Sequence, residues 1–227
     1  MGPRLLILLA AITAAPAALQ AQSAMGAPEG CKGTLTVQQR GCRILNVWTC
    51  EAEPGITYSS LGDEDGPFRI KKTDAEFQWL ATYYPRAGDE QTLAPSNPDP
   101  ESITELIDTG YDSFDFSVRT ALDGIETRVV GHDRLTGETE IDGEPLLTTE
   151  YEMTYISADG GRSGPYLGQQ YLSARHRLFI LGESWDAAAP EDVTDNSPVE
   201  FIYPGEEGFF SDTPRYGCDM LMSSFQP

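Results

Sequence analysis

The sequence predicts a mainly β protein, a single antiparallel β-rich domain of roughly ten strands with one short α-helix near residues 100–109. Apolar and polar residues alternate over several segments, including 114–118 and 149–155, and this period of two is typical of strands with one buried face. Asp-Gly pairs at 123–124 and 142–143 separate such segments and indicate hairpin turns. We expect these short connections to build an antiparallel curved sheet, as a half-barrel, a barrel or a sandwich.

Residues 1–21 have the three-part pattern of a secretory signal peptide. Arg4 is followed by the apolar run Leu5–Ala15 and then by small residues. No later stretch reaches the roughly 20 apolar residues that a membrane span needs, so we expect no span after signal cleavage. Residues 22–30 are small and polar and predict a flexible leader ahead of a single domain over 31–227. The protein is therefore predicted to be periplasmic or secreted, as an exported protein of a bacterial envelope.

Four cysteines lie in the exported part, and an even number there predicts disulfide bonds. Their number alone allows three pairings. If Arg40-Gly41 forms a two-residue hairpin turn, Cys31 and Cys50 lie opposite each other at a distance that a disulfide spans. Cys42 then pairs with Cys218 and ties the C-terminal region to the first hairpin. No pair of cysteines has the close spacing of a zinc site, so no metal is expected there.

The first strands are predicted at 43–50, 68–70 and 77–84. Residues 43–50 are apolar on both alternating faces, which is typical of a strand covered on both sides. Residues 87–100 are polar and contain three prolines. They predict a loop at which the domain could be subdivided.

The predicted helix follows this loop. Asp99 is expected to cap it, Pro100 to occupy its first position and Glu101 to lie near its positive end. Apolar residues then share one face, and Gly110 is expected to end the helix.

The longer C-terminal part is predicted to be a series of hairpins. If Asp123-Gly124 forms a two-residue turn, Val118 lies opposite Val129. The remaining strands are expected at 138–141, 149–155, 166–174, 178–182, 199–203 and 209–211, with an acidic loop from Trp185 to Pro198.

The charge of the chain excludes some classes of partner. The sequence has 36 acidic and 15 basic residues, and its formal net charge is −21. Such a surface repels phosphate groups, so we expect neither nucleic-acid binding nor docking on anionic lipid. It favours association with a basic protein.

No motif for catalysis, nucleotide binding or cofactor binding is present, so no catalytic residue and no cofactor is predicted. His132 and His176 are expected to be surface residues, and Asp133 to point away from the face that carries His132. The acidic segments 63–66 and 191–195 are expected to be solvated loops, with a calcium site as the alternative.

Aromatic residues are numerous and could pack in the core or line a cavity on the concave side of the sheet. Trp79, Phe116 and Tyr151 are the candidate ligand-binding residues. Our first functional hypothesis is a non-enzymatic binding protein for an apolar or lipid-like ligand, and the layout is compatible with half-barrel carriers of lipids. The alternatives are an acidic protein-interaction or inhibitor module, and a hydrolase with a carboxylate or calcium site.

Overall fold

The computed structural model of the protein describes residues 26–218. The predicted signal peptide, 1–21, lies outside the described residues, as does the first part of the predicted leader, 22–25. Within the described part, no helix is long and apolar enough to cross a membrane.

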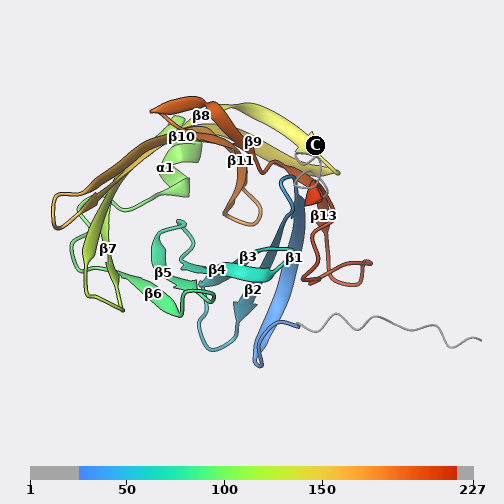
Figure 1. Cartoon of the computed structure of the whole chain (residues 1–227). Coiled ribbons are helices and arrows are strands. Elements are labelled where there is room, and N and C mark those ends of the chain that lie inside the picture. The colour runs from blue at the N-terminus through green and yellow to red at the C-terminus, as the bar shows by residue number, and fades with distance from the viewer. Residues whose placement is uncertain (1–25, 219–227) are drawn as a thin grey trace, which may run out of the picture.

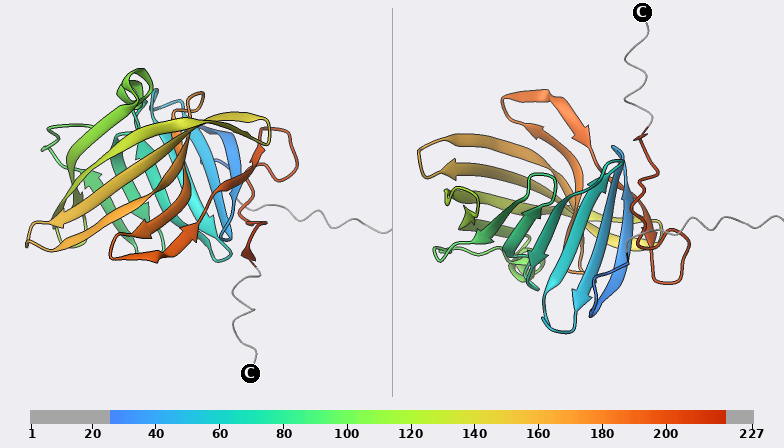
Figure 2. Two further views of the ribbon diagram at one scale, coloured as in Figure 1. Left: turned by 90° about the horizontal axis from the view of Figure 1, so that it is seen from above. Right: turned by 60° about the horizontal axis from the view of Figure 1, so that its bottom comes forward.

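One antiparallel sheet of thirteen strands forms the described structure, together with one short helix, and this confirms the mainly β class. Each strand pairs with its neighbours in sequence, except that β13 returns to lie beside β1. The sheet curls around a central space, and its edge strands β12 and β13 leave it unclosed (Figures 1 and 2). The elements are β1 (Cys31–Gln39), β2 (Arg43–Cys50), β3 (Thr57–Asp63), β4 (Gly66–Thr73), β5 (Trp79–Tyr84), β6 (Asp89–Leu93), α1 (Ile103–Thr109), β7 (Tyr111–Thr120), β8 (Glu126–Ile141), β9 (Glu144–Ser157), β10 (Arg162–Ser173), β11 (Leu178–Asp186), β12 (Ala189–Asp195) and β13 (Pro198–Ile202).

Three of these strands, β3, β6 and β12, were not expected from the sequence. Strand β6 lies within the predicted loop 87–100 and pairs with both β5 and β7, so the sheet continues through this segment. Strand β12 lies within the predicted loop that follows Trp185. Both strands are polar, so the alternation of apolar residues that marks a buried face is missing from them.

Helix α1 begins later than expected. Its N-cap is Ser102, whose hydroxyl accepts a hydrogen bond from the backbone N–H of Glu105. Asp99, the predicted cap, instead joins an isolated bridge to β7. Glu101 precedes the helix and is buried, so it is not a residue of the first helical turn.

Both predicted disulfides are present, Cys31–Cys50 and Cys42–Cys218. The turn between β1 and β2 nevertheless holds three residues, 40–42, and not two. A β-bulge in β1 adds one residue between this turn and the first disulfide. The bulge compensates for the longer turn, and Cys31 and Cys50 therefore face each other as predicted.

The β7–β8 hairpin also differs in register from the prediction. Its connection is five residues long, 121–125, so Val118 faces Thr127, and Val129 faces Phe116. The predicted pairing of Val118 with Val129 was wrong. A shift by two residues keeps each side chain on its predicted face, and Phe116 is fully buried.

The apolar core has two parts. The larger cluster is Leu35, Val37, Leu45, Val47, Leu61, Phe77, Ile103, Leu106, Leu146, Leu172, Leu178, Ile180 and Phe201. The smaller cluster is Phe114, Phe116, Val118 and Val129. Trp79 packs against both clusters, and a cavity opens beside it.

Candidate functional site

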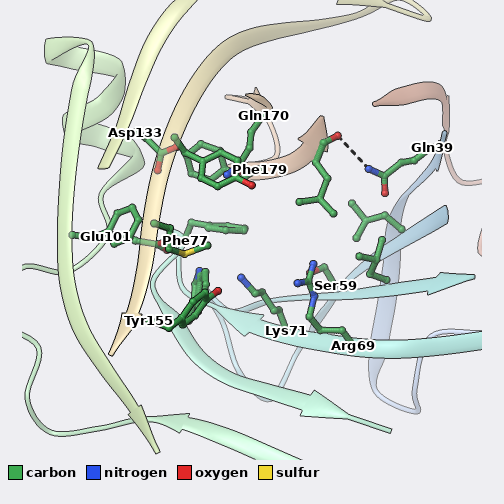
Figure 3. A pocket seen from close by; sticks show the side chains of 17 residues that line it. Gln39, Ser59, Arg69, Lys71, Phe77, Glu101, Asp133, Tyr155, Gln170 and Phe179 are labelled. Atoms are coloured by element: carbon green, nitrogen blue, oxygen red, sulfur yellow. Dashed lines mark hydrogen bonds between the residues drawn. The ribbon is translucent and has the colours of Figure 1, made fainter. Parts of the chain in front are cut away.

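An interior cavity of about 110 Å³ lies on the concave side of the sheet (Figure 3). An apolar protein cavity of about 150 Å³ holds benzene, which has six non-hydrogen atoms, so the space suits a molecule of roughly four to five. The lining residues come from strands on opposite sides of the curled sheet and from the segment before α1. They are Gln39, Leu45, Ser59, Leu61, Arg69, Lys71, Phe77, Trp79, Glu101, Phe114, Asp133, Tyr151, Met153, Tyr155, Gln170, Phe179 and Leu181.

Two cations of β4, Arg69 and Lys71, face this cavity (Figure 3). They are two positions apart, so both side chains leave the strand on the same face. Within the described residues, neither side chain forms an ion pair or a hydrogen bond. The ammonium group of Lys71 lies 3.2 Å from the centroid of the Trp79 ring, in a cation–π contact.

Burial makes the charged forms of these cations unfavourable. It lowers the pKa of Lys71 well below its usual value, and the positive charge of Arg69 lowers that pKa further. Burial also lowers the pKa of Arg69. The strand therefore places two basic side chains, without an ion-pair partner in the described residues, at the cavity wall.

Two carboxyl groups, those of Glu101 and Asp133, also line the cavity. Glu101 is 7% exposed and Asp133 is 5% exposed. Burial raises the pKa of Glu101 well above its usual value, and the charge of Lys71 only partly opposes this rise. Burial, and the neighbouring carboxyl of Asp112, raise the pKa of Asp133 to about 7.

Strand parity explains how Asp133 reaches the interior. Asp133 lies directly opposite Asp112 in the β7–β8 pair, and both carboxyl groups are buried. His132, the preceding residue, points to the other face and stacks against the ring of Tyr111 at 5.5 Å. The prediction that these two neighbours face opposite ways is therefore confirmed.

Glycines in two strands allow aromatic rings to lie flat against the cavity wall. The ring of Phe114 covers Gly131, which it faces across the β7–β8 pair. The ring of Tyr151 covers Gly168 in the same way across the β9–β10 pair. A Cβ atom at Gly131 would lie 2.2 Å from the carbonyl oxygen of Glu152, so only glycine fits.

The three predicted ligand-binding residues occupy two different places. Trp79 and Tyr151 line the cavity. Phe116 is fully buried behind Trp79, with the two rings in edge contact at 5.4 Å, and it supports the wall without reaching the space. Sequence analysis missed Arg69 and Lys71, because charged residues in a strand are usually assigned to the solvent side.

The prediction that His176 is an exposed surface residue was wrong. Its side chain is 14% exposed, and its Nε2 atom lies 3.4 Å from the Tyr203 hydroxyl. Burial lowers the pKa of this histidine. The neighbouring carboxylate of Glu144 accepts hydrogen bonds from Ser173 at 3.0 Å and from Tyr203 at 2.6 Å. Unlike the carboxyl groups of the cavity, that of Glu144 is satisfied by protein donors.

The two acidic segments lie at different places in the sheet. The segment 63–66 forms the β3–β4 connection, and the Asp63 carboxylate pairs with Arg43 and Arg86. The segment 191–195 belongs to β12 and is largely exposed. Among residues 26–218, no group of three or more potential ligand side chains is placed to hold a metal ion. Association with a basic protein and hydrolysis by carboxyl groups stay predictions.

Comparison with known proteins adds no assignment to this geometry. No protein-family model matches the chain, and neither the curated proteins nor the solved structures contain a match.

Proposed function

We propose that the protein is a binding protein that holds a small organic acid inside its curved sheet. The observation that carries this proposal is the pair of cations, Arg69 and Lys71, which face the cavity without a carboxylate partner in the described residues. An unpaired charge is costly in a protein interior, and a bound carboxylate removes that cost. The same two groups supply the charge-assisted hydrogen bonds that a carboxylate accepts.

The remaining walls suit the apolar part of such an acid. Phe77 and Phe179 pack edge to face at 5.1 Å beside the cavity, and Trp79 covers the Lys71 ammonium group. Pockets for drug-sized ligands measure about 300–1,000 Å³. A cavity of about 110 Å³ therefore favours a short acid over the lipid-like ligand that the sequence suggested.

We further propose that the protein works outside the cytoplasm, in the periplasm or as a secreted protein. Two disulfides, which persist in oxidising compartments, support this location together with the predicted signal peptide.

Thermal unfolding in the presence of propionate tests the binding proposal. Propionate combines a carboxylate with a short apolar chain, and sodium chloride at equal ionic strength is the control. At a propionate concentration about 100-fold above its Kd, binding adds about 2.7 kcal/mol to stability, which raises Tm by several degrees. The increase is expected to disappear in Arg69→Met. It is expected to persist in Arg119→Met, because Arg119 pairs with Glu126 on the exposed surface.

An absence of any increase with propionate would overturn the proposal. An equal increase in Arg69→Met would also overturn it, because binding would then occur elsewhere on the protein.

A further inference from the structure

We infer that the bound acid is a zwitterion, a small free amino acid whose carboxylate meets Arg69 and Lys71 and whose ammonium group meets Glu101 and Asp133. This inference rests on the proposed function and adds the second half of the ligand. Its basis is the set of unpaired polar atoms around the cavity, which divides into donors that need an acceptor and acceptors that need a donor.

The donors belong to one part of the wall. The guanidinium group of Arg69 and the ammonium group of Lys71 form no ion pair and no hydrogen bond with a side chain in the described residues. The indole N–H of Trp79 is buried and also lacks a partner there. A single carboxylate, with several lone pairs, can accept hydrogen bonds from such a group of donors.

The acceptors belong to another part of the wall. Oε2 of Glu101 and Oδ1 of Asp133 are buried and have no hydrogen-bond partner among the described residues. Oε1 of Gln39 is also buried without a hydrogen-bond partner there, although the side-chain NH2 group of Gln39 donates to the backbone oxygen of Asn196 at 2.8 Å. All three residues are more than nine-tenths buried and line the cavity. Figure 3 shows Gln39 across the site from Glu101 and Asp133, so the two carboxyl groups are the acceptors that one ammonium ion, with its several N–H donors, would satisfy.

Within residues 26–218, protein side chains do not satisfy these groups. Glu101 and Lys71 influence each other electrostatically, yet no ion pair joins them within the described residues. In Figure 3 the labelled side chains of Glu101 and Asp133 lie on one side of the site and those of Arg69 and Lys71 on another. Basic and acidic groups that line one cavity are complementary to a molecule that carries both a carboxylate and an ammonium group.

Charge and size favour an amino acid over simpler ligands. A plain carboxylate leaves the buried acceptors of Glu101 and Asp133 without donors, and a plain amine leaves the two cations unpaired. A zwitterion pairs both sets and adds no net charge to the interior. The cavity volume suggests roughly four to five non-hydrogen atoms, so alanine, which has six, is among the largest amino acids that it favours.

Isothermal titration calorimetry of the full exported protein with alanine, lactate and propionate tests this inference. The three probes have nearly the same shape and differ in one substituent, which is an ammonium group, a hydroxyl group or a hydrogen atom. Alanine is expected to bind at least about tenfold more tightly than propionate, because hydrogen bonds between charged groups are among the strong ones. Lactate is expected to be intermediate.

Two variants test whether the buried carboxyl groups cause the preference for alanine over propionate. Glu101→Gln is expected to lower the affinity for alanine to that for propionate and to leave the affinity for propionate unchanged. Glu105→Gln, a neighbouring exposed carboxylate on α1, is the matched control and is expected to change neither affinity. If Glu101→Gln does not fold, Asp133→Asn is used for the same comparison.

The outcomes separate this inference from the proposed function. If propionate or lactate binds as tightly as alanine, the zwitterion inference is wrong while the acid-binding function stands. If none of the three probes binds, the proposed function fails and the inference fails with it. A preference for alanine that survives both Glu101→Gln and Asp133→Asn would also overturn the inference.

Discussion

Replacing Asp133 by Asn is expected to stabilise the protein at about pH 8 and to change its stability little at about pH 4. In the unfolded chain an aspartate carboxyl titrates at about 3.9, whereas burial raises the pKa of Asp133 to about 7 in the folded protein. Between these two values the folded protein retains a proton that the unfolded chain releases. The free energy of unfolding therefore decreases as the pH rises from about 4 to about 7.

The size of this effect follows from the difference between the two pKa values. Each unit corresponds to about 1.4 kcal/mol, so the full cost of ionising Asp133 in the folded protein is roughly 4 kcal/mol. The neighbouring carboxyl of Asp112 shares the titration, so the gain expected for Asp133→Asn is about 2–4 kcal/mol at about pH 8. For a domain of this size the gain corresponds to an increase in Tm of roughly 4–16 °C.

Urea unfolding of the wild type and of Asp133→Asn at several pH values measures this difference. The matched control is Asp115→Asn, in which the replaced carboxylate lies on the outer face and pairs with Arg128. That ion pair lowers the pKa of Asp115, so its stabilising effect is present at neutral pH and is lost on acidification. Asp115→Asn is expected to lose at most about 1 kcal/mol at about pH 8. A destabilised Asp133→Asn at that pH, or a gain of equal size at about pH 4, would refute the reasoning.

Three further substitutions test other parts of the structure. Lys71→Met is expected to raise Tm of the ligand-free protein, because it removes a half-buried cation that has no ion-pair partner in the described residues. Lys72→Met is expected to lower Tm slightly, because it breaks a surface ion pair. A decrease of Tm in Lys71→Met would contradict this prediction. Gly131→Ala is expected to destabilise the protein by about 1–3 kcal/mol in urea unfolding, because the added Cβ atom would lie 2.2 Å from a backbone oxygen. An unchanged urea midpoint would show that the backbone shifts to make room for the Cβ atom. The Cys42–Cys218 disulfide joins residues 176 positions apart, and its removal is expected to lower the free energy of unfolding by about 2–5 kcal/mol in the same assay. A decrease below about 1 kcal/mol would mean that other contacts hold the C-terminal segment.

The strands that could be predicted are those with one apolar face. Phe114, Phe116 and Val118 alternate with polar residues, and all three are buried on the inner face of β7. The Asp142-Gly143 pair also forms the expected tight turn, with positive φ angles of 51° and 76°. Strands β6 and β12 were missed because their place in the sheet depends on backbone pairing and not on apolar side chains.

The site could be predicted only in part, because its charged residues contradict the usual pattern. In β4, Phe68 and Ile70 alternate with Arg69 and Lys71, and hydrophobicity alone turns the apolar pair inward. The structure places the two cations at the cavity, while Phe68 lies beneath the guanidinium group of Arg43 at 5.1 Å. Such an inversion is favourable only where a cavity or a ligand receives the charges, so a single sequence does not reveal it.

A crystal structure of the protein grown with alanine tests the central claim most directly. We expect density for one alanine molecule inside the cavity, with its carboxylate within about 3 Å of the Arg69 guanidinium and the Lys71 ammonium groups. A cavity that contains only water at saturating alanine, or a carboxylate that lies away from both cations, would contradict it.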